Sequence, residues 1–122
     1  MKPPKITFRQ IEALQDYYSD TNGDLYSVAR LIDDTKQLKP FEAPLATLNL
    51  SSIVWDRYNL LELAFHCKRV NKADLKKPII IAWDGCIADG RHRLIKALML
   101  GKRTIKAVRM TWKPEPCKRG DA

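Results

Sequence analysis

Residues 78–110 decide the fold, and they have the sequence Pro-Ile-Ile-Ile-Ala-Trp-Asp-Gly-Cys-Ile-Ala-Asp-Gly-Arg-His-Arg-Leu-Ile-Lys-Ala-Leu-Met-Leu-Gly-Lys-Arg-Thr-Ile-Lys-Ala-Val-Arg-Met. An apolar run from Pro78 to Trp83 is followed by Asp84-Gly85 and by a second apolar step from Cys86 to Ala88. An Asp-Gly pair between two apolar runs is the usual signal of a two-residue hairpin turn. We therefore predict an antiparallel hairpin here.

A helix and a further strand are predicted after the hairpin. The apolar pattern becomes helical from Arg91 to Leu100, and Gly101 stands where a left-handed residue commonly ends a helix. A strand is then expected over Thr104 to Met110. This alternation of strands and helices predicts a small α/β (α+β) domain with a mixed sheet.

The joint between the second strand and the helix has the chemistry of a phosphate site. Asp89-Gly90 lies where unpaired backbone N–H groups point out of a helix start and the helix dipole favours an anion. Gly90 would let a ligand approach the backbone, and Arg91, His92 and Arg93 follow at once. Guanidinium groups suit phosphate oxygens because they donate two parallel hydrogen bonds. We predict a phosphate site at Gly90–Arg93.

The string from Ile87 to Val108 resembles the phosphate-binding segment of the ParB/sulfiredoxin superfamily. Members of that superfamily have Asp-Gly-x-His-Arg or Gly-Glu-Arg-Arg, then a helix, a glycine and a strand. The resemblance is close over about a third of the chain and looser over residues 39–110. It implies a ParB/sulfiredoxin-like fold that binds the phosphates of a nucleotide such as ATP or CTP, and an association with DNA.

Departures from the family pattern narrow the expected activity. Arg91 stands where sulfiredoxins have their catalytic cysteine and where ParB clamps have a glutamate, so reductase activity is not expected and clamp-type CTP hydrolysis is placed in doubt. The form Asp89 to Arg93 is nearer to the free-serine-kinase branch. Pro40-Phe41-Glu42 resembles a Pro-His-Glu found upstream in that branch.

Three side chains are candidates for catalysis. Asp89 is a candidate Mg²⁺ ligand or general base, and Glu42 is a second carboxylate. His92 could supply a hydrogen bond or a proton. An aspartate before a glycine at a helix start is equally often an N-cap, so both interpretations of Asp89 stay open.

The charge of the chain is uneven along its length. Residues 1–61 hold seven Lys/Arg against eight Asp/Glu, and residues 62–122 hold fifteen against six. From Arg91 to Arg119 there are ten basic residues and a single acid, Glu115, which suggests attraction to a polyanion such as DNA. The candidate DNA contacts outside the phosphate turn are Lys96, Lys102, Arg103, Lys106, Arg109, Lys113, Lys118 and Arg119. An ordinary solvated basic surface is the alternative.

The rest of the chain predicts flanking helices and one more strand. The 122 residues are expected to form one domain with a helical extension at 1–38, a core at 39–112 and a basic tail at 113–122. Helices are expected at 6–18, at 25–37 with Asp24 as N-cap, and at 57–70 with Asp56 as N-cap; a strand is expected at 45–50. The apolar runs are too short for a membrane span, and three cysteines without a disulfide spacing fit the cytoplasm.

The expected function is therefore phosphate binding with DNA association, as a nuclease or as a nucleotide-dependent DNA-binding protein. A small-molecule kinase of the free-serine-kinase type would use the same phosphate site with a carboxylate base. A non-catalytic interaction or inhibitor module of a mobile element would need neither the phosphate site nor a carboxylate base. The sequence leaves these three alternatives open.

Overall fold

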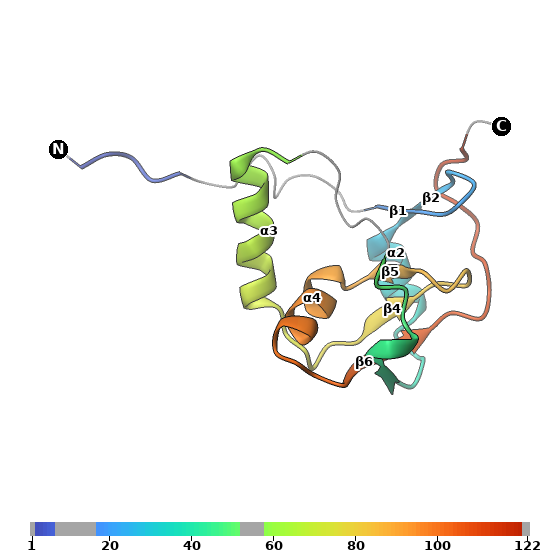
Figure 1. Ribbon diagram of the computed structural model, residues 1–122. Helices are drawn as coiled ribbons and strands as arrows, with labels where there is room; N and C mark the ends of the chain where they lie inside the picture. The colour runs from blue at the N-terminus through green and yellow to red at the C-terminus, as the bar shows by residue number, and fades with distance from the viewer. Residues whose placement is uncertain (1, 7–16, 52–57, 121–122) are drawn as a thin grey trace.

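The computed structural model describes residues 2–6, 17–51 and 58–120 (Figure 1). Among them are three α-helices and two small sheets, so the mixed α+β class is confirmed. A four-stranded sheet has the order β3-β6-β4-β5, from β3 (Phe41–Pro44), β6 (Thr104–Arg109), β4 (Ile79–Ile81) and β5 (Ile87–Asp89). β4 and β6 run parallel, and the other two pairings are antiparallel. The predicted mixed sheet is therefore present.

The hairpin of β4 and β5 forms where the sequence predicts it, with a slightly longer turn. The Gly85 amide donates to the Ala82 carbonyl at 3.0 Å, and the Ala82 amide donates to the Cys86 carbonyl at 2.8 Å. Gly85 has φ +84°, so a tight turn followed by a left-handed glycine closes the hairpin. The loop thus contains Trp83, Asp84 and Gly85 rather than two residues.

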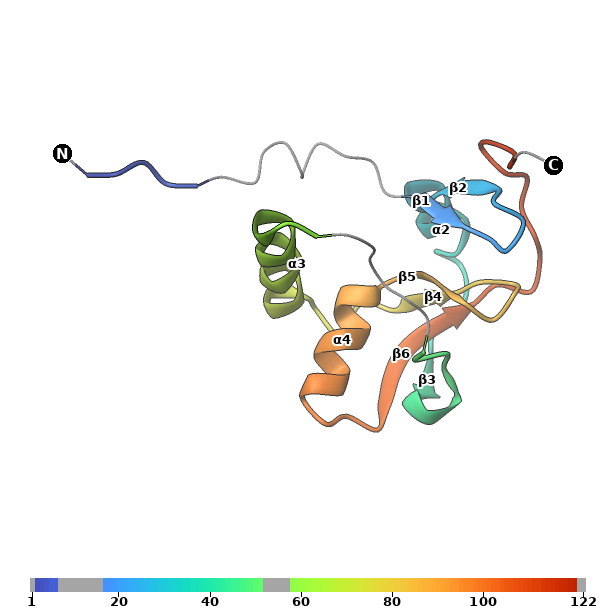
Figure 2. The ribbon, with the colours of Figure 1, turned by 45° about the horizontal axis from the view of Figure 1, so that its top comes forward.

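The four-stranded sheet is covered on both faces (Figure 2). One face packs against α4 (Arg91–Met99), where the buried side chains include Ile79, Ile105 and Leu94. The other face packs against the N-terminal elements. The buried residues of this second cluster are Tyr18, Tyr26, Val28, Leu31, Ile80, Ala82, Ala88, Val108 and Met110.

Helix α4 matches its prediction closely. Its first residue is Arg91, and its C-terminus is closed by Gly101 at φ +70°. The Lys102 amide donates to the Ala97 carbonyl and the Gly101 amide to the Leu98 carbonyl, which is the Schellman arrangement. The strand after it is β6, one residue shorter than expected.

The predicted N-terminal helices are partly wrong. Most of the helix expected at 6–18 lies outside the described residues, but β1 (Tyr17–Ser19) is a strand paired with β2 (Leu25–Ser27). Helix α2 (Val28–Asp34) begins only after β2, and Ser27, not Asp24, accepts the capping N–H, that of Arg30. The spacing of apolar residues from Leu25 onward is compatible with a helix, but pairing with β1 makes the first three residues extended.

Two further boundaries differ from the predictions. The strand expected at 45–50 is wrong, because Leu45–Thr47 is a short 3-10 helix and the strand is β3 just before it. The helix expected at 57–70 is α3 (Leu60–Lys72), capped by Asn59; Asp56 and Arg57 lie outside the described residues. No helix of the described segments is long and apolar enough to span a membrane.

The C-terminal segment lies against the N-terminal hairpin (Figure 2). The Leu25 amide donates to the Lys118 carbonyl at 2.7 Å, and the Cys117 amide donates to the Leu25 carbonyl at 2.8 Å. The Gly120 amide donates to the Asp24 carboxylate at 2.7 Å. Within the expected basic tail, 113–122, Cys117 and Lys118 are therefore partners of β2, and Asp24 binds Gly120 instead of capping a helix.

Candidate functional site

The turn at Gly90 packs closely against β4. Gly90 is the N-cap of α4 with φ +101°, a backbone conformation that residues with a side chain rarely adopt. A Cβ on Gly90 would lie 2.5 Å from Cγ2 of Ile79 in β4. The space beside this glycine is therefore occupied by a core side chain. Close packing between α4 and β4 explains the glycine without a ligand.

Arg93 is held by the fold on two sides. Its Nη2 donates to the Asp89 carboxylate at 2.9 Å and its Nη1 donates to the Pro78 carbonyl at 2.7 Å. The side chains of Arg93 and Asp89 are 16% and 21% exposed. This half-buried ion pair ties the first turn of α4 to the end of β5 and the entry to β4. Asp89 thus does not act as a side-chain cap for α4.

His92 forms a pair with His66 of α3. The His66 Nδ1 and His92 Nε2 atoms are 2.8 Å apart, and the ring planes differ by 14°. This separation is that of a hydrogen bond. Burial lowers the pKa of His92 to about 4, and the nearby charges of Arg69, His66, Arg93 and Arg91 act in the same direction. His92 is consequently neutral at pH 7.

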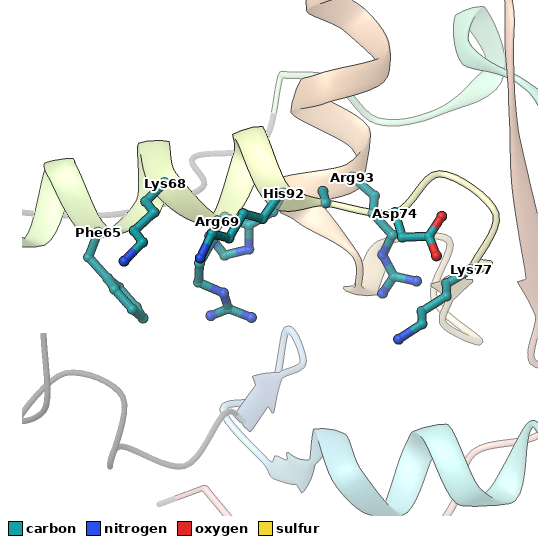
Figure 3. Close-up of a pocket in the computed structure, with 9 residues that line it drawn as sticks. Phe65, Lys68, Arg69, Asp74, Lys77, His92 and Arg93 are labelled. Carbon is teal, nitrogen blue, oxygen red and sulfur yellow. The ribbon is translucent and has the colours of Figure 1, made fainter.

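A basic groove of about 390 Å³ lies between α3, the loop after it and α4 (Figure 3). The charged or ionisable side chains that line it are Lys68, Arg69, Lys72, Asp74, Lys77, His92 and Arg93. Five of these are cations at pH 7 and a single one is a carboxylate. In Figure 3 the ends of Lys68, Arg69, Arg93 and Lys77 project to the same side. Such a lining attracts a compact anion with several negative charges.

Most cations of the basic groove were missed by sequence reasoning. Lys68, Arg69 and Lys72 all lie on α3, the first two adjacent and the third one helical turn on. That spacing was available as a signal. The apolar spacing of Leu60, Leu61, Ala64 and Phe65 predicts instead a helix whose apolar side faces the core. Of these four residues, Phe65 is buried and the other three are exposed.

The other predicted phosphate and catalytic residues are dispersed. Arg91 does not line the basic groove; it lines two smaller hollows, on the sides of β1 and of Leu50. Glu42 is on β3 and Asp89 is on β5, the two opposite edges of the four-stranded sheet. Glu42 accepts a hydrogen bond from the Thr104 hydroxyl at 3.1 Å. Of the predicted catalytic residues, only Asp89 and His92 lie in the same region.

The predicted DNA contacts are also distributed over several elements. Lys96 donates to the Asn71 and Ala73 carbonyls at 2.9 and 2.8 Å, where it neutralises the C-terminal end of α3. Arg119 pairs with Glu115 at 3.0 Å. The remaining candidates are divided between the α4–β6 loop (Lys102, Arg103), β6 (Lys106, Arg109) and the C-terminal segment (Lys113, Lys118).

The Asp89 carboxylate, predicted as a Mg²⁺ ligand, is engaged by a neighbouring arginine. Mg²⁺ prefers several oxygen ligands, and the Asp89 carboxylate already binds Arg93. Within the described segments, no group of three or more His, Cys, Asp and Glu side chains could hold a metal ion. The group bound to the Asp89 carboxylate is the Arg93 guanidinium, a cation.

Comparisons of the chain with protein-family models, with curated proteins and with solved structures find no match.

Proposed function

We propose that this chain is a ParB/sulfiredoxin-like protein that binds the phosphates of a nucleotide or nucleic acid. The observation that carries the proposal is the lining of the basic groove, with five cations against one carboxylate. His92 and Arg93 of the phosphate motif belong to that lining, and α3 supplies Lys68, Arg69 and Lys72. The proposed ligand position is thus beside the first turn of α4 and reaches towards α3.

Each group would have a distinct role. Arg69 and Lys77 would neutralise phosphate oxygens, since both are exposed cations at the basic groove. His92 would offer a neutral imidazole, which can accept a proton or donate a hydrogen bond. Arg93 would keep the turn in place through Asp89. The kinase alternative needs Asp89 as a base, and this ion pair makes that role less favourable.

DNA is the second candidate ligand, supported by the formal net charge of +8 and by the exposure of Lys68, Arg69 and Lys72. If DNA is the ligand, its affinity should fall steeply with salt, because each neutralised phosphate contributes a slope of roughly −0.9 in a log–log plot. A nucleotide with fewer phosphates should show a shallower slope. The two ligand classes can therefore be separated in one titration series.

The test is a calorimetric or fluorescence titration of the full chain with ATP, CTP, GTP, tripolyphosphate and duplex DNA, with and without Mg²⁺. An Arg69→Ala variant should bind phosphate ligands about tenfold or more weakly, because a charge-assisted contact contributes roughly 1.5 to 3 kcal/mol. Arg103→Ala removes an exposed arginine of the α4–β6 loop outside the basic groove and should bind the nucleotides and tripolyphosphate as wild type does. No binding of any of these ligands at low salt would refute the proposal.

A further inference from the structure

A second hollow, larger than the basic groove, lies between α2 and one face of the four-stranded sheet. This apolar cavity has a volume of about 680 Å³. Its walls come from α2, from the connector after α2 and from β4 and β6. The apolar side chains that line it are Val28, Ile32, Leu38, Pro40, Pro78, Ile80 and Val108.

The apolar cavity and the basic groove share three cations. Arg69, Lys77 and Arg93 line both hollows. In Figure 3 their charged ends point towards the side on which α2 lies. The two hollows therefore adjoin at these cations, and one ligand could place an apolar group beneath α2 and an anionic group among them.

The one uncharged polar side chain of the cavity wall is satisfied by its own helix. The Thr35 hydroxyl donates to the Leu31 carbonyl at 2.8 Å and approaches the Ile32 carbonyl at 3.3 Å. Besides the three shared cations, Lys36 and Asp89 line the cavity, and the Asp89 carboxylate is paired with Arg93. The rest of the lining is apolar. Such a cavity favours a flat apolar ring system whose polar edge stays near the opening.

We infer that the apolar cavity binds the base of a nucleoside phosphate whose phosphates lie in the basic groove. This inference rests on the proposed phosphate binding and selects a mononucleotide over a nucleic-acid duplex. The volume lies within the usual range of small-molecule sites, roughly 300 to 1,000 Å³. The bases of a duplex are stacked inside it and cannot enter a cavity beneath a helix, whereas a free nucleotide presents one base next to its phosphates.

Ile32 offers a direct test because it lines the cavity and is 44% exposed, so a larger side chain at this position can project over the opening. Ile32→Trp should obstruct entry of the base. Leu63→Trp is the matched control, since Leu63 is an equally exposed helical residue, also 44%, that does not line the cavity. Both variants are compared with wild type by chemical denaturation, and Ile32→Ala serves as a milder second variant.

The titrations use ATP and inorganic tripolyphosphate, which share a phosphate chain and differ in the nucleoside. Wild type should bind ATP at least tenfold more tightly than tripolyphosphate. Ile32→Trp should lose that advantage while its affinity for tripolyphosphate stays unchanged, and Leu63→Trp should keep it. Ile32→Ala should reduce it severalfold.

The two levels of the proposal fail in different ways. If wild type binds ATP and tripolyphosphate equally well, and Ile32→Trp changes neither, the base does not enter the apolar cavity and phosphate binding stands alone. If duplex DNA binds and competes with tripolyphosphate while ATP has no advantage, the ligand is a nucleic acid and the inference is overturned. If wild type binds neither ATP nor tripolyphosphate, the proposed function itself fails.

Discussion

The first turn of α4 and the C-terminal half of α3 both carry cations, but Arg93 of α4 is bound within the fold whereas the cations of α3 are exposed. In α4, Arg93 is 16% exposed and its guanidinium binds Asp89 and the Pro78 carbonyl. In α3, Lys68, Arg69 and Lys72 are exposed at the rim of the basic groove. A motif typical of phosphate sites can thus serve packing, while the exposed cations beside it come from the neighbouring helix.

Substitution at Gly90 should have the largest effect on the α4 side of this comparison. Gly90→Ala places a Cβ 2.5 Å from Ile79 and forces alanine to φ +101°, so we expect a loss of about 3 kcal/mol of unfolding free energy. Gly101→Ala is the matched control, because its φ is +70° but no atom lies within 4 Å of the added Cβ. That control should lose only about 1 kcal/mol. Urea denaturation of both variants measures the difference, and equal losses would refute the packing role of Gly90.

Removal of Arg93 should have the next largest effect. Arg93→Ala removes the guanidinium that binds the Asp89 carboxylate and the Pro78 carbonyl. The loss should cost about 2 kcal/mol, because this half-buried pair is only partly screened by water. Arg69→Ala removes an exposed side chain that lies over the Phe65 ring and should change stability by less than Arg93→Ala does. A structural role for Arg93 is refuted if Arg93→Ala is as stable as wild type, or if Arg69→Ala is the more destabilised of the two variants.

Lys96 connects the two helices, and its loss should have a smaller effect. Lys96→Met keeps the aliphatic stem but removes the ammonium that binds the Asn71 and Ala73 carbonyls, so we expect a loss of about 1 kcal/mol. Lys102→Met, in the exposed loop after α4, is the control and should be neutral within about 0.5 kcal/mol. Thermal or chemical unfolding of the two variants decides the point.

At neutral pH the smallest expected effect on stability is that of His92 titration, and it grows as the pH falls. The pKa of His92 is lowered to about 4 from an ordinary value of 6.5, so between these values the unfolded chain binds the proton more strongly than the folded one. His92 therefore makes stability fall as pH decreases from 6.5 towards 4. In His92→Asn this part of the decline should be absent. Denaturation midpoints at several pH values test it, and identical pH profiles would show that His92 does not contribute.

The sequence predicts the part of the fold that depends on local signals. Asp84-Gly85 indicates the hairpin, Gly101 indicates the end of α4, and both features are confirmed. β2 is not predicted, although Leu25–Ser27 pairs with the nearby Tyr17–Ser19 and Asn22-Gly23 between the two strands is a local hairpin signal. The helical spacing of the apolar residues outweighs that signal in the prediction. The bridge to Lys118 depends on a residue far along the chain, and no local pattern indicates it.

The candidate site is predicted only in part for a similar reason. Gly90, His92 and Arg93 have recognisable positions in a motif, so sequence reasoning finds the turn. The orientation of α3 follows from its packing against α4, and the sequence alone does not show that Lys68 and Arg69 face the same groove as His92. The partner of His92, His66, is 26 positions away and belongs to no motif.

The contact between β2 and the C-terminal segment has a consequence for the timing of folding during synthesis. The Asp24 carboxylate and the Gly120 amide that binds it are separated by 96 positions. Ribosomes add roughly 5 to 20 residues per second, so β2 exists for several seconds before that partner is made. During this interval the edge of β2 that later receives Lys118 is open to other chains. A nascent chain halted before residue 117 should therefore depend more on chaperones than one extended past residue 120.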